Sequence, residues 1–114
     1  MDRHLTIDIE RRAQFDAELR ALQEECLGYQ HTYFEPPEST RMQYDAVVYE
    51  TESMIVRRAN NKSYLIRPSY QVIVISRDAE TVLPRAIQEH FERCNPGRPF
   101  VRDNLYHFPF TIVY

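Results

Sequence analysis

Apolar residues recur at helical spacing in residues 7–27. Intervals of three and four positions place them on one face of an amphipathic helix. The members of this stripe are Phe15, Leu19, Leu22 and Cys26. Gly28 follows directly, and glycine readily takes the left-handed conformation that commonly ends a helix. The pattern therefore predicts a helix over residues 7–27 that packs one face on a core.

A second helical stripe lies in residues 81–94. It starts at Val82 or Leu83, and its further members are Ala86, Ile87, His90, Phe91 and Cys94. Thr81 is expected to cap this helix, because its hydroxyl can accept a hydrogen bond from a free N–H of the first turn. Pro84 fits the first turn, where the N–H that proline lacks has no partner within the helix. The run Asn95-Pro96-Gly97 is expected to end the helix.

Five further stretches are rich in β-branched and aromatic residues, which favours strands. They are residues 29–34, 44–52, 64–77, 100–102 and 106–114. Met54, Ile55 and Val56 could extend the second of these strands, and residues 57–62 are expected to form a polar turn or a long loop. Proline has no N–H to donate to a sheet. The third strand is therefore expected to start after Pro68, or to lie at an edge or a bulge there, and Pro109 indicates an edge or a bulge in the last strand.

The order of these elements is helix, three strands, helix, two strands. Successive hairpin-like strands with two helices predict a single α+β domain over residues 1–114. We expect a mainly antiparallel sheet of about five strands with both helices on one face. The alternative is a split βαβ arrangement, in which residues 64–77, the second helix and residues 100–102 form a parallel crossover.

Composition narrows the possible functions. The chain has 114 residues, of which 43% are hydrophobic and 27% charged, which is typical of one folded domain. A formal net charge of -3 does not favour a protein that grips nucleic acid, although nucleic acid could still slide past it. Cys26 and Cys94 form no CxxC pair and are expected to be reduced packing residues of a protein made in a cytoplasm. We expect no signal peptide and no membrane partner, because no apolar run is long enough to span a bilayer.

No residue pattern indicates catalysis, a metal or a cofactor. The four histidines, His4, His31, His90 and His107, have no neighbours at ligand spacing. With two glycines in the chain, a glycine-rich phosphate loop and a nucleophile elbow are both ruled out. Glu24 and Glu25 are adjacent on the first helix and would not share a face, and Glu50 and Glu52 fit a solvated strand face. We therefore expect no enzyme activity.

Two clusters are candidate contact surfaces, with ordinary solvated surface as the alternative for each. One is the densest basic cluster of the chain, Arg57, Arg58 and Lys62. The other surrounds Pro36 and Pro37 and consists of Glu35, Glu38 and Arg41. Near the end of the chain, Asp103 and Asn104 predict a turn, because their side chains can bond to their own main chain and Asn tolerates positive φ. His107 could clasp this turn or lie at an interface.

Several stretches of residues 30–114 resemble a family of small tail-completion proteins of long-tailed bacteriophages. The matching stretches are Tyr33-Phe34-Glu35-Pro36-Pro37, residues 42–50, Arg58-Ala59-Asn60-Asn61 with Tyr64, residues 70–75, and Arg102-Asp103-Asn104-Leu105-Tyr106-His107. The Asp-Asn-Leu element followed by His107 is the most specific of them. The chain departs from the family at residues 44–49, where the family tends to have Tyr-Pro-Cys-Ile-Val-Tyr.

The resemblance implies a structural protein of the virion neck, the tail terminator. Such proteins form a hexameric ring that ends the tail tube and joins it to the head connector. DNA would pass through the lumen without specific binding, and the ring would be assembled in the host cytoplasm. Edge strands at Pro68 and Pro109 could pair with a neighbouring subunit. The alternatives are another head-tail connector position, stopper or adaptor, and a small α+β binding module unrelated to phages.

Overall fold

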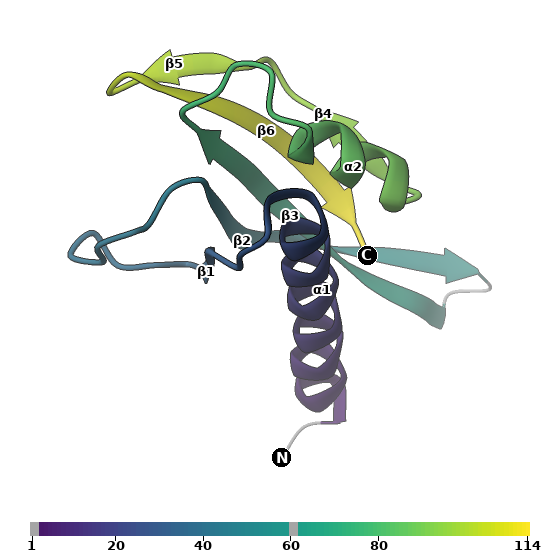
Figure 1. Cartoon of the computed structure of the whole chain (residues 1–114). Coiled ribbons are helices and arrows are strands. Elements are labelled where there is room, and N and C mark those ends of the chain that lie inside the picture. Colours follow the sequence, from purple (N-terminus) through teal and green to yellow (C-terminus); the bar gives the residue numbers. More distant parts are fainter. Residues whose placement is uncertain (1–2, 60–61) are drawn as a thin grey trace.

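The computed structural model describes the main chain of residues 3–59 and 62–114, and the side chains of residues 9–52 and 67–114. Two helices and six strands make up the fold (Figure 1). The helices are α1 (Arg3–Leu27) and α2 (Leu83–His90). The strands are β1 (Thr32–Phe34), β2 (Ala46–Ala59), β3 (Lys62–Ser76), β4 (Cys94–Pro96), β5 (Phe100–Arg102) and β6 (Leu105–Val113). The expected α+β class is confirmed, and the sheet has one strand more than the sequence predicts.

The strands form one sheet in the order β1-β2-β3-β6-β4, and β5 also pairs with β6. The pairs β2–β3, β3–β6, β4–β6 and β5–β6 are antiparallel, whereas β1 runs parallel to β2. Since β3 and β4 are both antiparallel to β6, they run in the same direction with β6 between them. This is a split βαβ arrangement. Because β5 is antiparallel to β6 as well, both β4 and the expected residues 100–102 run parallel to β3. The sheet is mainly antiparallel, as expected.

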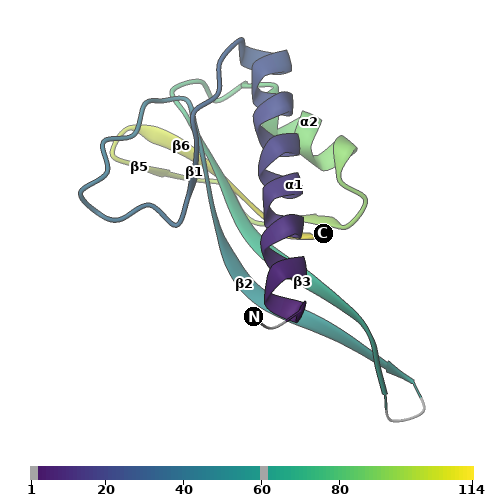
Figure 2. The ribbon, with the colours of Figure 1, turned by 90° about the horizontal axis from the view of Figure 1, so that it is seen from below.

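Both helices lie on the same face of the sheet (Figures 1 and 2). Helix α1 begins four residues before its predicted start and ends as predicted, because Gly28 adopts a φ of 86° and its N–H bonds to the oxygen of Glu24 at 2.8 Å. The buried core joins both helices to the three central strands. Its members are Phe15, Leu19, Leu22, Val47, Tyr49, Tyr70, Val72, Val74, Leu83, Ile87, Phe91, Phe110 and Ile112.

The second helix is shorter than its stripe predicts. Phe91 is already extended, with φ −90° and ψ 128°, and Cys94 begins β4. The main chain after Phe91 pairs with β6; for example, Val113 N donates to Arg93 O at 3.0 Å. These N–H and C=O groups therefore form sheet hydrogen bonds in place of helical ones. Thr81 is not the cap: the N-cap is Val82, without a side-chain hydrogen bond. Pro84 lies in the first turn, as expected.

The expected turn or loop at residues 57–62 is too long, because β2 continues to Ala59 and β3 begins at Lys62. Asn60 and Asn61 lie outside the described residues. The alternative that the third strand starts after Pro68 is also wrong, since β3 runs through that residue. The pairing of β6 with β3 ends at Ser69, and a register shift lies in the facing part of β2, so Pro68 occupies the edge position that proline tolerates.

Pro68 O still accepts a hydrogen bond from Tyr114 N at 3.0 Å, and beyond it the described parts of β2 and β3 pair only with each other. We call residues 53–68 the ribbon; its two strands are residues 53–59 and 62–68. Within the described main chain, no third strand pairs with the ribbon, and Figure 2 shows it leaving the body of the molecule. An isolated two-stranded hairpin is marginally stable in water. The ribbon is therefore a segment that another molecule could stabilise.

Candidate functional site

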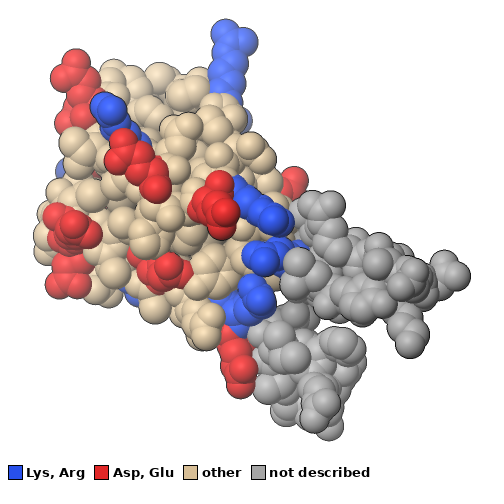
Figure 3. Space-filling view, turned by 90° about the vertical axis from the view of Figure 1, so that its right-hand side faces the viewer, with Lys and Arg blue, Asp and Glu red and all other residues tan. Residues whose placement is uncertain are grey.

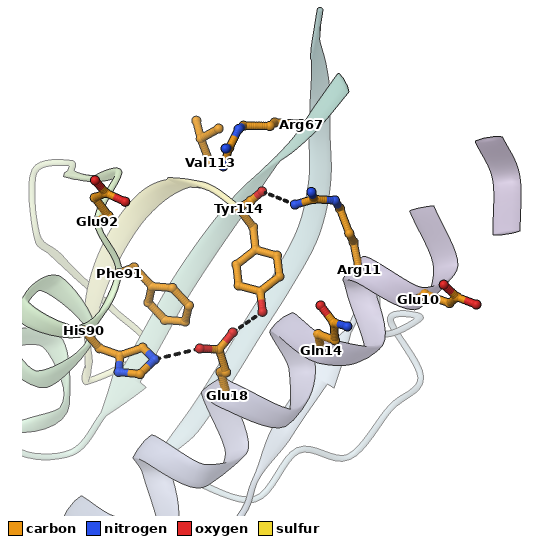
Figure 4. A pocket seen from close by; sticks show the side chains of 10 residues that line it. All are labelled: Glu10, Arg11, Gln14, Glu18, Arg67, His90, Phe91, Glu92, Val113 and Tyr114. Carbon is orange, nitrogen blue, oxygen red and sulfur yellow. Dashed lines mark hydrogen bonds and ion pairs between the residues drawn. The ribbon is translucent and has the colours of Figure 1, made fainter. Parts of the chain in front are cut away.

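A cavity of about 490 Å³ lies where α1, α2, β3 and the end of β6 meet, and we call it the fork pocket (Figure 4). The residues that line it are Glu10, Arg11, Gln14, Glu18, Arg67, His90, Phe91, Glu92, Val113 and Tyr114. Glu10, Arg11, Gln14 and Glu18 come from α1, and Arg67 comes from the base of the ribbon. Segments that are far apart in the sequence therefore share this pocket.

Glu18 is the polar hub of the fork pocket. One of its oxygens lies 2.9 Å from His90 Nε2, and the other accepts a hydrogen bond from the hydroxyl of Tyr114 (Figure 4). Burial, together with the hydrogen bond to Glu18 and the negative charge of that carboxylate, raises the pKa of Tyr114 to about 12. The tyrosine is therefore a protonated donor at neutral pH and not a general base. The cluster ties α1 to α2 and to the end of β6.

Two arginines lie at the other end of the pocket. Arg11 Nη1 donates to the main-chain oxygen of Tyr114 at 2.9 Å. The Nε of Arg67 is buried and has no hydrogen-bond partner within the described part of the chain. Glu10 and Glu92 are exposed, so the lining combines charges of both signs. Such a lining could hold a polar group, but it contains no nucleophile next to a base.

The cysteines and the acidic side chains are the candidate nucleophiles and metal ligands, respectively. Burial raises the pKa of the Cys94 thiol, and burial followed by the charge of Glu25 raises that of Cys26, so both thiols are less nucleophilic than usual. Among the described residues, no group of three His, Cys, Asp or Glu side chains could hold a metal ion.

A second region of interest is the open face, the side of the sheet that faces away from both helices. Side chains alternate along a strand, so the residues next to the core positions in β2, β3 and β6 point to this side. They are Val48, Glu50, Gln71, Ile73, Ile75, His107, Pro109 and Thr111. Val48 lies opposite Ile73, which in turn lies opposite Pro109. The centre of the open face is therefore apolar.

A smaller cavity of about 230 Å³ lies on the open face, and we call it the sheet pocket. Its lining residues are Glu35, Pro36, Val48, Tyr49, Glu50, Gln71 and Ile73. Val48 and Ile73 contribute apolar side chains to it, whereas Glu35 and Glu50 contribute carboxylates from exposed residues. The sheet pocket thus combines apolar surface with negative charge.

Glu35 is held at the sheet pocket by its main chain and by its side chain. Its N–H donates to Tyr49 O at 2.9 Å, and its Oε1 accepts from Thr51 N at 3.3 Å. Its backbone has a φ of 43°, in the left-handed region that few residues other than glycine adopt. The segment after β1 is therefore anchored to the outer edge of β2.

Among the candidate contact residues whose side chains are described, Glu35 alone lines a cavity. Glu35 lines the sheet pocket, whereas Glu38 and Arg41 are exposed in the segment between β1 and β2 and line neither cavity. Arg57 and Arg58 belong to β2 and Lys62 begins β3, but their side chains lie outside the described residues. The expected cluster around the two prolines is therefore divided.

Asp103 and Asn104 form the turn between β5 and β6, with φ values of 53° and 63°. His107 lies beyond this turn on β6. Its Nδ1 is 3.0 Å from the oxygen of Leu105, and its ring stacks on that of Phe100 with centroids 4.7 Å apart. These contacts hold β5 against β6 on the open face.

Sequence reasoning missed both pockets. It placed Glu50 on a solvated face and treated His90 as part of a core stripe. One signal could have indicated the open face: Val47-Val48 and the run Val72-Ile73-Val74-Ile75 are apolar at both parities, which predicts strands with apolar side chains on both faces. The fork pocket has no such signal, because its residues are scattered over the whole chain.

No known protein-family model matches this chain, and no curated protein matches it either. Within the described residues, no helix has both the length and the apolar character needed to cross a membrane.

Proposed function

We propose that this chain is a structural subunit of a phage neck, a tail terminator that forms a hexameric ring at the end of the tail tube. The observation that carries the proposal is that one molecule has two different surfaces available for a partner, the ribbon and the open face. The ribbon has no third strand within the described main chain, and the open face has an apolar centre that neither helix covers. The family resemblance of residues 30–114 supplies the biological setting.

Two different surfaces favour a ring over a simple dimer. A contact between one surface and a different surface of the next copy is heterologous, and repetition of such a contact around an axis closes a ring. The molecule is elongated, with principal extents of 49, 27 and 25 Å, and the ribbon leaves the body as a separate projection (Figure 2). Both features suit a subunit that reaches over its neighbour.

The distribution of charge suits a ring around DNA. The ribbon, residues 53–68, has four basic and no acidic residues, so it carries +4. The other residues include 10 basic and 17 acidic ones, so the remainder carries -7 of the total of -3. An acidic inner wall would repel the phosphate backbone at short range and let DNA pass without specific binding. The proposed protein partners are the tail tube and the head connector, and no membrane takes part.

A structural role also suits the chemistry of the fork pocket. Its Tyr114–Glu18–His90 cluster joins three elements, and the tyrosine stays protonated at neutral pH. Such a cluster stiffens the junction from which the ribbon projects. We therefore propose no catalytic activity and no cofactor for this chain.

Native mass spectrometry and negative-stain electron microscopy test the proposal directly. We expect a ring with six times the 13.7 kDa mass of the subunit. Added to growing tail tubes of the phage that encodes it, the ring should bind one end and stop elongation. Deletion of its gene should give over-long tails without heads. A protein that stays monomeric at all concentrations and does not bind tubes would refute the proposal.

A stopper or adaptor in the same neck is the closest alternative, because it would use the same unfinished surfaces. The two positions differ in their binding partner. A terminator binds the end of the tail tube in the absence of heads, whereas a stopper binds the connector of a filled head in the absence of tails. Pull-down from phage mutants that lack either heads or tails separates them.

A further inference from the structure

Two surfaces of this molecule complement each other in charge and in polarity. We propose that the sheet pocket of one copy receives the basic ribbon of the next copy, an inference that rests on the proposed ring. The occupant of the sheet pocket is thus a second copy of this chain. The contact is heterologous, since the sheet pocket and the ribbon are different surfaces.

The sheet pocket has the chemistry to accept a segment that is both apolar and basic. Val48 and Ile73 face each other across β2 and β3 and form its apolar part. Glu35 and Glu50 lie at the same cavity, and none of its described lining residues is cationic. A carboxylate beside apolar surface favours a partner that brings an arginine or lysine together with apolar atoms.

The ribbon has the matching composition. Its basic residues are Arg57, Arg58, Lys62 and Arg67. The apolar run Met54-Ile55-Val56 precedes Arg57, and the pair Leu65-Ile66 precedes Arg67. No other segment of this length in the chain carries four cations without an anion. On the face seen in Figure 3, basic side chains of the described residues lie beside the grey region, and acidic side chains are spread over the rest. In the sequence, residues 53–68 carry positive charge and the remainder carries the excess of negative charge.

The sheet pocket cannot be filled by the ribbon of its own chain. Val48 and Glu50 lie on β2 only a few residues before the ribbon begins, and Gln71 and Ile73 lie on β3 a few residues after it ends. The same two strands continue from the pocket into the ribbon, which leaves the body (Figure 2). A paired two-stranded segment cannot fold back over its own base without breaking its ladder, so the ribbon must come from another molecule.

Charge reversal tests the contact in both directions. The pocket variant is Glu50→Lys, because Glu50 is exposed and does not bear on the core. The ribbon variant combines Arg57→Glu and Arg58→Glu. Matched controls make the same charge changes away from both surfaces, at exposed residues that line neither pocket: Glu80→Lys for the first, and Arg93→Glu with Arg98→Glu for the second. Circular dichroism checks that every variant folds.

Each reversed variant alone should lose assembly, with its self-association constant weakened about tenfold or more, because like charges then meet at the contact. An equimolar mixture of the two variants should assemble again. In the mixture the reversed ribbon meets the reversed pocket, and the native ribbon meets the native pocket, so both junctions are restored. A chain that carries both reversals should also assemble by itself. Analytical ultracentrifugation measures all of these states.

Three results would overturn the proposal. Wild-type rings that both variants leave intact would show that the subunits meet elsewhere, while the proposed ring function would stand. Variants that fail alone and also fail when mixed would show no direct pairing of the two surfaces. A wild-type protein that is monomeric and shifts double-stranded DNA through Arg57 and Arg58 would remove the ring and the contact together and assign the ribbon to nucleic acid.

Discussion

The two faces of the sheet are built by the same strands, yet the two helices cover only one of them. On the covered face, Phe15 of α1 stacks on Tyr70 with ring centroids 4.3 Å apart and meets Tyr49 edge to face at 5.4 Å. On the open face, Val48 and Ile73 are partly exposed and border a cavity. Both faces are apolar at their centres. The difference therefore lies in what packs against them and not in the kind of residue.

This difference separates stability from interaction. Aromatic side chains that are completely enclosed contribute their full transfer free energy and their dispersion contacts to folding. Apolar side chains that are partly exposed contribute less to the folding free energy of the isolated subunit. Burial of their remaining surface can stabilise a complex with a partner. The covered face is expected to determine whether the chain folds, and the open face what it binds.

The sharpest test compares one residue from each face. Phe15→Ala should lower the free energy of unfolding by about 3–5 kcal/mol, because it leaves a cavity among four aromatic rings. Ile73→Ala, the matched truncation on the open face, should cost the isolated subunit only about 1 kcal/mol and should instead weaken assembly. Urea denaturation of dilute protein measures both values. Equal losses of stability would show that the two faces do not differ as described.

A buried amide supports the covered face from its edge. Gln23 is completely buried; its Nε2 donates to Asp45 O at 3.0 Å, and its Oε1 accepts from His31 N at 2.7 Å and from the hydroxyl of Thr32. Gln23→Met should cost about 2–3 kcal/mol, since it leaves buried main-chain groups without partners. Gln88→Met, at an exposed position of α2, is the control and should be near neutral. A cost for Gln23→Met no larger than that of Gln88→Met would contradict this role.

The turn between β5 and β6 affects the open face by a smaller amount. Asn104 has a φ of 63°, and a residue with a Cβ and no side-chain hydrogen bonding is strained there. Asn104→Ala should cost about 1–2 kcal/mol, whereas Asn104→Gly should be neutral or slightly stabilising. Thermal unfolding of both variants provides the measurement. Equal effects of the two substitutions would show that backbone strain is not the cause.

The smallest expected effect concerns alkaline pH. The pKa of Tyr114 is raised from its ordinary value of 10 to about 12 in the folded protein. The folded state therefore favours the protonated phenol, so this contribution is complete below pH 10 and is lost as pH rises from 10 to about 12. Tyr114→Phe should flatten the loss of stability in that window. Part of the slope should remain, because burial and the bond to Asp16 also raise the pKa of Tyr49.

Urea midpoints at pH 10 and at pH 12 compare the wild type with Tyr114→Phe. Tyr106→Phe serves as the control, since Tyr106 is exposed and lies on β6 away from the fork pocket. If the loss of stability between pH 10 and pH 12 is the same in Tyr114→Phe as in the wild type, the hydroxyl of wild-type Tyr114 does not bond to Glu18 in solution. The comparison of the two faces would not be affected.

The elements that local chemistry controls could be predicted. The stripe of Phe15, Leu19 and Leu22 predicted α1, and Gly28 ended it as expected. Asp103 and Asn104 predicted a turn whose φ values are both positive. In each case the decisive interactions lie within a few residues, so the sequence pattern contains them. The same reasoning failed at Cys94, where pairing with Ile112 outweighed the helical stripe.

The candidate site was less predictable, because long-range pairing creates it. Glu50 lines a pocket together with Glu35, which is 15 positions away in the sequence and is bonded to Thr51 N. Glu18, His90 and Tyr114 meet although 96 positions separate the first from the last. No local pattern contains such meetings.

The sequence by itself determined where helices, turns and apolar strands lie, because propensity and periodicity act over a few residues. It also determined the segregation of charge, with +4 on residues 53–68 and -7 on the rest. Only the tertiary structure decided which parity of each strand is covered, with Val47 buried under the helices and Val48 left on the open face. Both valines satisfy a strand equally well. What separates them is which side of the sheet α1 and α2 pack against, and that is a property of the assembled chain.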